Sequence, residues 1–333
     1  MTSLRADKLT RLRAGLEALR SRYDARYLSS DPLEFPRRFD RTDDREVVAL
    51  VASTLAYGNV TTIRASVGRL LTRMGSQPAA FTRSIEPRHH LELFVDFRHR
   101  WTTGRDVVCL LYFARQMMER FGSVGSFFRE VYDPGEAIES ALVRFSEAAL
   151  TLDHGGLYGS KTLPRSAGVR YFFPSPRTGS ACKRLNMLLR WMVRPDDGVD
   201  LGIWDFVSPS RLVIPLDTHI ARIGLHLGWA RRKTPDWRMA LEITRALARL
   251  DPADPIRYDF VLSRMGILER CPRHPLSSHC DLCELKRTLR LRKRARPRER
   301  SVRLRQGFVG TSPKPEGRRR EPGAPPSAAS LRA

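Results

Sequence analysis

The stretch "GSACKRLNMLLRWMVR", residues 179–194, places Lys183 at the start of a strongly apolar helical pattern, directly after a turn of small residues. Apolar residues recur within it at steps of three and four, which predicts a helix with a buried face. The lysine is therefore either a charged residue at the exposed end of a buried helix or a reactive amine. The apolar positions are Leu185, Leu188, Leu189, Met192 and Val193.

Helical spacing of apolar residues also dominates the rest of the chain, and no sustained alternation of apolar and polar residues indicates a strand. A stretch rich in Gly and Pro, residues 153–181, interrupts the pattern, and an irregular segment of that length is more often functional than idle. The sequence therefore predicts an all-α fold. Helices are expected near residues 9–23, 44–56, 62–74, 105–119, 138–145, 185–193, 218–228, 237–250 and 256–268.

The formal net charge of +23 is unevenly distributed over the 333 residues. Residues 286–333 hold 16 Lys and Arg against 3 acidic residues and have no hydrophobic repeat, which predicts a disordered Arg-rich tail. The preceding residues, 1–285, are expected to form one helical domain, and they are basic too, with 43 Lys and Arg against 33 acidic residues. This excess favours a polyanionic partner such as nucleic acid.

Two patterns bear on location. No apolar run approaches the roughly 18 residues of a membrane-spanning helix, so we expect no membrane partner. Arg5 and Asp7 interrupt the N-terminus before any apolar segment of a signal peptide forms. The odd count of five cysteines argues against a disulfide framework, and we expect a cytoplasmic protein.

A second motif, "IPLDTHIARIGLHLGW" (residues 214–229), sets Asp217 directly before another helical pattern. Aspartate is a favoured N-cap because its carboxylate accepts backbone N–H groups that the first helical turn leaves unpaired. Taken singly, Asp217 is explained as a cap and Lys183 as a solvated helix end. Their combination, 34 residues apart, carries more information than either residue.

Together the two motifs resemble those of the helix-hairpin-helix DNA glycosylases, the endonuclease III-like repair enzymes. Those proteins carry a hairpin L-P-G-x-G-x-K, an apolar helix, and then V-D-T-H-x-x-R. This chain lacks the Leu-Pro pair and has alanine at the second glycine position. More narrowly, the pairing of "GSACKRLN" with "PLDTH" resembles a bacterial family of proteins of unknown function, the DUF2400 family. The matching positions are Gly179, Ala181, Lys183, Asp217, Thr218, His219 and Arg222.

The resemblance implies a two-lobed helix-hairpin-helix fold in which Lys183 is the nucleophile and Asp217 its carboxylate partner. The partner would be double-stranded DNA with a damaged base, bound by a monomer associated with the nucleoid. The interval of 34 residues is similar to that of archaeal 8-oxoguanine glycosylases, which favours an oxidised purine. The residues that the resemblance places at the DNA are Gly179, Ser180, Ala181, Tyr57, Asn59, His219 and Arg222.

This chemistry needs these residue types. Excision of a base breaks an N-glycosidic bond through an oxocarbenium-like sugar, which a nearby carboxylate stabilises. A neutral lysine amine attacks the anomeric carbon and forms a Schiff base, which permits β-elimination at the abasic sugar. Lysine-mediated glycosylase and lyase activity is therefore the leading functional hypothesis.

Two further residues are candidates for the base pocket. Trp204, in the insertion between the two motifs, either stacks on a base or packs in the core. Asp259, at the start of a late helix, either reads a base edge or caps that helix.

The segment "CPRHPLSSHCDLC" places Cys271, His274, Cys280 and Cys283 at a C-x2-H-x5-C-x2-C spacing. That spacing suits a structural zinc ion. Endonuclease III-like proteins carry an iron–sulfur cluster on four cysteines at the corresponding end, whereas this chain has Leu289 where a fourth would follow. Zinc, an iron–sulfur cluster and no metal remain alternatives; none is needed for the catalysis expected above.

Two other functions remain open. A protein with the glycosylase scaffold could bind nucleic acid without cutting it, in which case it would tolerate Lys183→Gln. A protein that acts on a ribosome or an anionic membrane through residues 286–333 would lose all binding when that tail is deleted.

Overall fold

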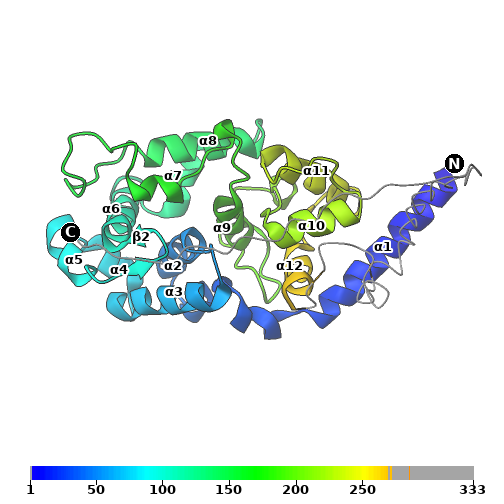
Figure 1. Cartoon of the computed structure of the whole chain (residues 1–333), viewed down its shortest axis with the longest axis horizontal. Helices are drawn as coiled ribbons and strands as arrows, with labels where there is room; N and C mark the ends of the chain where they lie inside the picture. Colours follow the sequence, from blue (N-terminus) through cyan, green and yellow to red (C-terminus); the bar gives the residue numbers. More distant parts are fainter. Residues whose placement is uncertain (1, 269–270, 272–284, 286–333) are drawn as a thin grey trace, which may run out of the picture. The chain divides into compact units, whose positions relative to one another are not determined.

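The structure is a computed structural model, and it describes residues 2–268, 271 and 285 (Figure 1). All of them belong to one compact unit, which spans residues 1–291. The described residues are mostly helical, which confirms the expected helical fold. Their strand structure is one antiparallel hairpin, β1 (Arg98–His99) with β2 (Thr102–Thr103). None of the described helices is both long and apolar enough to cross a membrane.

Each helix expected from the apolar spacing is present, and three further helices, α4, α5 and α7, were not predicted. Short 3-10 helices fill several connections: η1 (Ala25–Ser30), η2 (Pro32–Glu34), η3 (Pro36–Arg38), η4 (Gly168–Phe172), η5 (Pro176–Thr178) and η6 (Pro209–Arg211). The α-helices are α1 (Thr2–Arg22), α2 (Thr42–Thr54), α3 (Val60–Met74), α4 (Pro78–Arg83), α5 (Pro87–Leu93), α6 (Gly104–Phe121), α7 (Val124–Val131), α8 (Ile138–Ala149), α9 (Lys183–Val193), α10 (Thr218–His226), α11 (Trp237–Ala248) and α12 (Asp259–Leu268).

Helix α9 lies between α2 on one side and the pair α10 and α12 on the other (Figure 1). Every residue from Arg184 to Val193 is buried, so the helix is enclosed on all sides. Two of its last carbonyls accept bonds from the segment that follows: Trp191 O from Leu201 N at 2.8 Å, and Met192 O from Trp204 N at 2.7 Å. Only its first residue, Lys183, keeps partial access to solvent.

Carboxylates neutralise two arginines at the C-terminal end of the enclosed helix, Arg190 within α9 and Arg194 at its C-cap. Arg190 contacts Asp259 at 2.7 Å and Asp200 at 3.0 Å, while Arg194 contacts Asp200 and, at 2.9 Å, Asp254. Enclosing Arg190 and Arg194 without charged partners would cost several kcal/mol, which these carboxylates offset. The cluster links α9 to the 195–216 segment and to the start of α12.

Helices α10 and α12 approach closely at Gly266. A Cβ atom at this position would lie 2.7 Å from His219 Cβ, a distance that side chains essentially never reach. The two helices therefore need glycine here to keep their separation.

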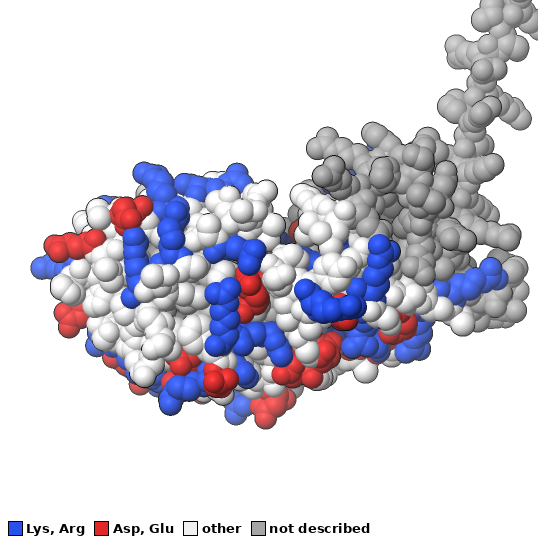
Figure 2. Space-filling model, turned by 90° about the horizontal axis from the view of Figure 1, so that it is seen from below, with Lys and Arg blue, Asp and Glu red and all other residues white. Residues whose placement is uncertain are grey.

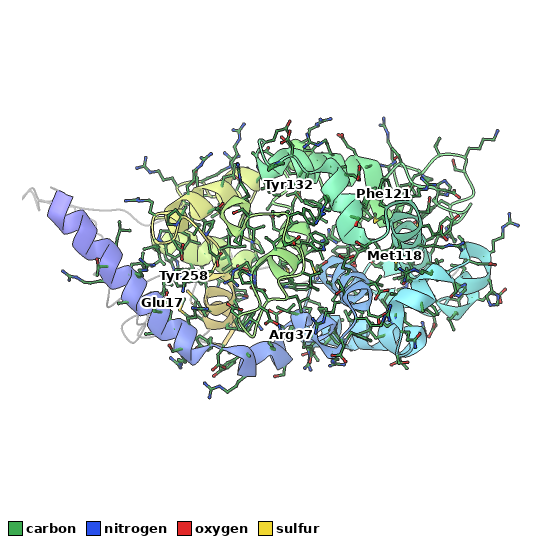
Figure 3. All side chains as sticks on the ribbon, turned by 180° about the vertical axis from the view of Figure 1, so that it is seen from behind. Glu17, Arg37, Met118, Phe121, Tyr132 and Tyr258 are labelled. Carbon is green, nitrogen blue, oxygen red and sulfur yellow. The ribbon has the colours of Figure 1, made fainter. Side chains whose placement is uncertain are left out.

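The N-terminal helix is held against the start of α12 by a polar contact. Tyr258 Oη donates to Glu17 Oε1 at 2.6 Å, and Arg257 lies 3.2 Å from the same carboxylate. Figure 3 shows Glu17 and Tyr258 facing one another. On the buried side of α1, Leu16 and Leu19 are fully covered, as expected from the apolar spacing.

We predict that Gly266→Ala lowers the free energy of unfolding by about 1–3 kcal/mol, because the new methyl group overlaps His219. Gly68→Ala is the matched control: Gly68 lies inside α3 with open space around it, so alanine there stabilises the helix by about 0.5–1 kcal/mol. Urea denaturation of both variants measures the difference. Equal effects of the two substitutions would contradict the close approach of α10 and α12.

A second prediction concerns Asp259. Burial raises its pKa to about 6, the attraction of Arg190 offsets part of this, and the nearby charges of Asp217 and Asp200 add to it. The folded-state pKa exceeds the ordinary value of 3.8, so the stability that Asp259 contributes is fully present below pH 3.8 and is lost as the pH rises to about 6. The side chain of Asp259→Asn does not titrate. Its free energy of unfolding should therefore rise by about 2–3 kcal/mol relative to that of the native chain between pH 3.5 and 7.

Urea unfolding at both pH values measures this gain. Asp251→Asn is the control of opposite sign: although burial acts against it, hydrogen bonds from Arg257 and from the backbone lower the pKa of Asp251. The stability of the native chain should increase relative to that of Asp251→Asn as the pH rises. A stability difference between Asp259→Asn and the native chain that stays constant with pH would refute the assignment.

Candidate active site

A cleft of about 950 Å³ opens at the start of α9. Its walls come from the connection between α2 and α3, the turn before α9, the start of α10 and one face of α12. Among the residues predicted to be functional, those that line it are Tyr57, Asn59, Ser180, Ala181, Lys183, Asp217, His219 and Asp259. Segments far apart in the sequence are thus brought to one site.

The turn before α9 contains two residues in the left-handed region. Gly179 has φ +80°, which glycine adopts without strain, and Cys182, the residue that precedes α9, has φ +47°. No side chain caps α9, so its first backbone N–H groups are left without a side-chain acceptor and favour an anion. The element before the turn is the 3-10 helix η5 rather than an α-helix.

Lys183 is the first residue of α9 and is half-buried. Its Nζ atom donates to the backbone oxygen of Ala56, just beyond α2, at 3.2 Å. The structure forms no ion pair between Lys183 and Asp217, although both line the cleft. The amine is therefore oriented by a carbonyl and is not bound to a carboxylate.

Asp217 is the N-cap of α10, as its position in the sequence predicts. Its Oδ1 atom accepts from His219 N at 2.8 Å and from Ile220 N at 2.7 Å. These bonds fix the orientation of the carboxylate. Within the described part of the chain, its Oδ2 atom has no hydrogen-bond donor and remains available to a ligand.

Most of the described charged side chains of the cleft that form no ion pair are cations. The guanidinium group of Arg184 donates to the backbone oxygens of Thr54, at 3.1 Å, and Tyr171, and that of Arg170 donates to the carbonyls of Leu163 and Pro164. Neither arginine has a carboxylate partner among the described residues. Burial lowers the pKa of Arg184 in consequence. The cleft is thus electrostatically suited to an anionic ligand.

Two of the residues that the resemblance places at the DNA, Asn59 and Tyr57, have local structural roles here. Asn59 caps α3, accepting from Thr61 N at 2.8 Å. Tyr57 is 9% exposed, and its hydroxyl donates to His99 O at 2.9 Å. His219 has a buried Nδ1 atom without a hydrogen-bond partner in the described residues.

Trp204 and Arg222 do not line the cleft. Trp204 is 2% exposed, stacks on Phe128 with ring centroids 5.4 Å apart, and donates from Nε1 to Glu46 at 2.8 Å. This ring is enclosed in the core. Arg222 donates to the backbone oxygen of Cys271, so it joins α10 to the chain beyond α12. Gly179 belongs to the turn before α9 and does not line the cleft either.

Asp259 lies on the floor of the cleft but is 3% exposed and paired with Arg190. Its carboxylate is thus engaged within the protein. The structure assigns it a part in the charge cluster under α9.

Cys182, beside Lys183, and the cysteines among the proposed metal ligands bear on the chemistry. Burial raises the pKa of Cys182 to about 12, so the thiol beside Lys183 stays protonated and is a packing residue. Of the proposed metal ligands, Cys271 is described, with its Sγ atom 3.9 Å from His226 Nδ1. His274, Cys280 and Cys283 lie outside the described residues. The described residues hold no group of three side chains that suits a metal ion.

Several residues of the site were missed in the sequence. Arg184 follows the lysine directly, and Tyr171 lies in the irregular segment; both line the cleft. Trp101, at the tip of the β1–β2 hairpin, packs against Tyr57. The sequence signal was the "RHRWTT" stretch, residues 98–103, in which a tryptophan has basic and polar neighbours and no apolar one to share a buried helix face.

The fold and the cleft define a mostly helical protein with a cationic cleft between helix N-termini. Residues 31–268 match the family model described as protein of unknown function (DUF2400). The match covers more than half of the chain, including both motifs, and the chain belongs to this family. No curated protein and no solved structure matches the chain.

Two substitutions distinguish the hydrogen bonds that Asp217 accepts as a cap from the effect of its charge. Asp217→Ala should lower the free energy of unfolding by about 1 kcal/mol, because two N–H groups of α10 lose their acceptor. Asp217→Asn should leave it nearly unchanged, since asparagine is an equally good N-cap. Urea denaturation measures both. An Asn variant as unstable as the Ala variant would show that the charge, not the cap, stabilises α10.

Proposed function

We propose that this protein is a DNA glycosylase with abasic-site lyase activity, in which Lys183 is the nucleophile and Asp217 the stabilising carboxylate. The observation that carries the proposal is that both residues stand at helix starts around one cleft, without pairing with each other. A free carboxylate oxygen and a separate amine are the two groups that the reaction needs. The two-lobed helix-hairpin-helix architecture, with the cleft between the lobes, belongs to the same proposal.

The net charge supports DNA as the partner. Basic side chains spread over the face shown in Figure 2, with acidic ones between them. The chain as a whole carries +23. Neutralisation of backbone phosphates by such a surface supplies affinity that does not depend on sequence. The uncapped start of α9 adds backbone N–H groups that suit a phosphate beside the reacting nucleotide.

The electron pair of the neutral Nζ amine forms a bond to C1′ of the damaged nucleotide while the C1′–N glycosidic bond breaks. The base leaves with the electron pair of the broken C1′–N bond and is protonated, and the amine loses a proton. Opening of the sugar ring then gives an iminium, the Schiff base. Asp217 stabilises the positive charge that develops on the sugar.

The second candidate is a nucleic-acid-binding protein that does not cut. The bond from Lys183 Nζ to Ala56 O favours it, because this contact gives the lysine a structural task in joining α9 to the end of α2. Both candidates require a cationic cleft. They differ in whether a covalent bond forms at Lys183.

We expect the native protein to form a covalent adduct with duplex DNA on addition of borohydride, which reduces the Schiff base to a stable amine. The substrates are duplexes with an abasic site, 8-oxoguanine, uracil or an oxidised pyrimidine. Lys183→Gln should abolish the adduct, while Lys161→Gln, at an exposed lysine outside the cleft, should leave it unchanged. Gel electrophoresis measures trapping and strand cleavage. Absence of adduct, base release and cleavage on every lesion would support the binding protein instead.

Asp217→Asn should reduce the rate of base release by about 100-fold or more while the protein stays folded, because the neutral amide no longer stabilises the developing charge. Single-turnover kinetics on the lesion that traps best measure this rate. A rate within a few-fold of the native value would remove Asp217 from the mechanism.

A further inference from the structure

The β1–β2 hairpin carries an exposed aromatic ring beside the cleft. Trp101, at its tip, is 50% exposed, whereas the other four tryptophans of the chain are buried or half-buried. Tyr171, which contacts it, is exposed as well, and a contiguous exposed apolar surface marks an interaction site.

Trp101 is held rigidly by its neighbours. It stacks on Tyr57 with ring centroids 4.8 Å apart and planes inclined by 22°, and it meets the edge of Tyr171 at 5.2 Å. The hydroxyl of Tyr57 bonds to the backbone of His99 and to Thr102, on the two strands of the hairpin. Tyr57 and Tyr171 also line the cleft that contains Lys183. The three rings form a fixed aromatic platform at its edge.

Cationic groups surround this platform. The guanidinium carbon of Arg184 lies 3.7 Å from the centroid of the Tyr171 ring, and that of Arg100 lies 4.7 Å from the centroid of Trp101. Arg100 has φ +55° in the two-residue turn, where glycine or asparagine is usual, so the hairpin tip is strained to present this pair. Aromatic faces combined with arginine are the chemistry by which proteins bind unpaired nucleobases.

The exposed ring also has space beside it. Trp101 lines a second cleft of about 610 Å³, together with Tyr158 and Arg105. A volume of this order accommodates a small aromatic ligand. One platform thus separates the cleft of Lys183 from a cleft with room for a base.

We propose that Trp101, supported by Tyr57 and Tyr171, stacks an unpaired nucleobase next to the nucleotide that enters the Lys183 cleft. The inference rests on the proposed action on damaged DNA, since an unpaired base arises where a nucleotide leaves the duplex. Tyr57 and Arg100 already contact Trp101, so the base stacks on the part of the ring that they leave exposed. Stacking reads no hydrogen-bonding edge, so the platform accepts any base. It binds the DNA and takes no part in the bond-forming step.

The test uses a duplex with one unpaired 2-aminopurine, whose fluorescence falls on stacking, and the same duplex fully paired. The native protein should quench the unpaired base and bind that duplex about tenfold more tightly than the paired one. Trp101→Leu and Trp101→Gln should lose both effects, and Trp101→Phe should retain quenching. Phe121→Leu, at an exposed phenylalanine outside both clefts, is the matched control and should behave as the native chain.

The readouts separate this inference from the proposed function. In one outcome, the native protein forms the adduct while a folded Trp101→Leu or Trp101→Gln variant still quenches the unpaired base and still prefers that duplex. This result overturns the platform alone. Quenching that depends on Trp101, without any adduct at Lys183, overturns the glycosylase proposal and leaves the platform in place. Circular dichroism and thermal melting establish that each variant is folded.

Discussion

The enclosure of α9 is the constraint on which the rest of the structure depends. A helix buried on every side satisfies its own backbone bonds, but the charges of Arg190 and Arg194 must be neutralised within the protein. The carboxylates that do so belong to the segment after α9 and to the region around the start of α12. Their positions are therefore fixed by the charges of α9. The start of α9, where Lys183 reaches solvent, therefore lies in a cleft lined by the connection between α2 and α3 and by helices α10 and α12.

The two helix starts at the cleft differ in electrostatic character. At α10 the carboxylate of Asp217 occupies the positive end of the helix and accepts two of its N–H groups. At α9 no side chain has this role, and the helix end adds to the charges of Lys183 and Arg184. The start of α10 thus favours a developing cation and the start of α9 an anion. A nucleotide has both, in its sugar and its phosphate, when its base departs.

Much of the helical fold could be predicted from the sequence, because apolar residues at helical spacing define a helix whatever it packs against. The helices α4 and α5 were missed since they are too short to show a period, although each begins with a proline at its first turn, Pro78 and Pro87. The cap at Asp217 depends on neighbouring residues alone and could therefore be predicted from the sequence. Trp204 and Asp259 were ambiguous because burial depends on partners distant in sequence, Glu46 and Arg190.

The cleft is built from segments near residues 57, 183, 217 and 259, and none of its walls is complete without contacts across the chain. Contacts of such sequence separation close long loops, and the entropy lost in closing them is offset only when the surrounding packing is complete. Lys183 thus meets Ala56 only after more than half of the chain has been made and collapsed. A nascent or partly folded molecule has an ordinary solvated lysine, and the oriented amine exists in the completed fold alone.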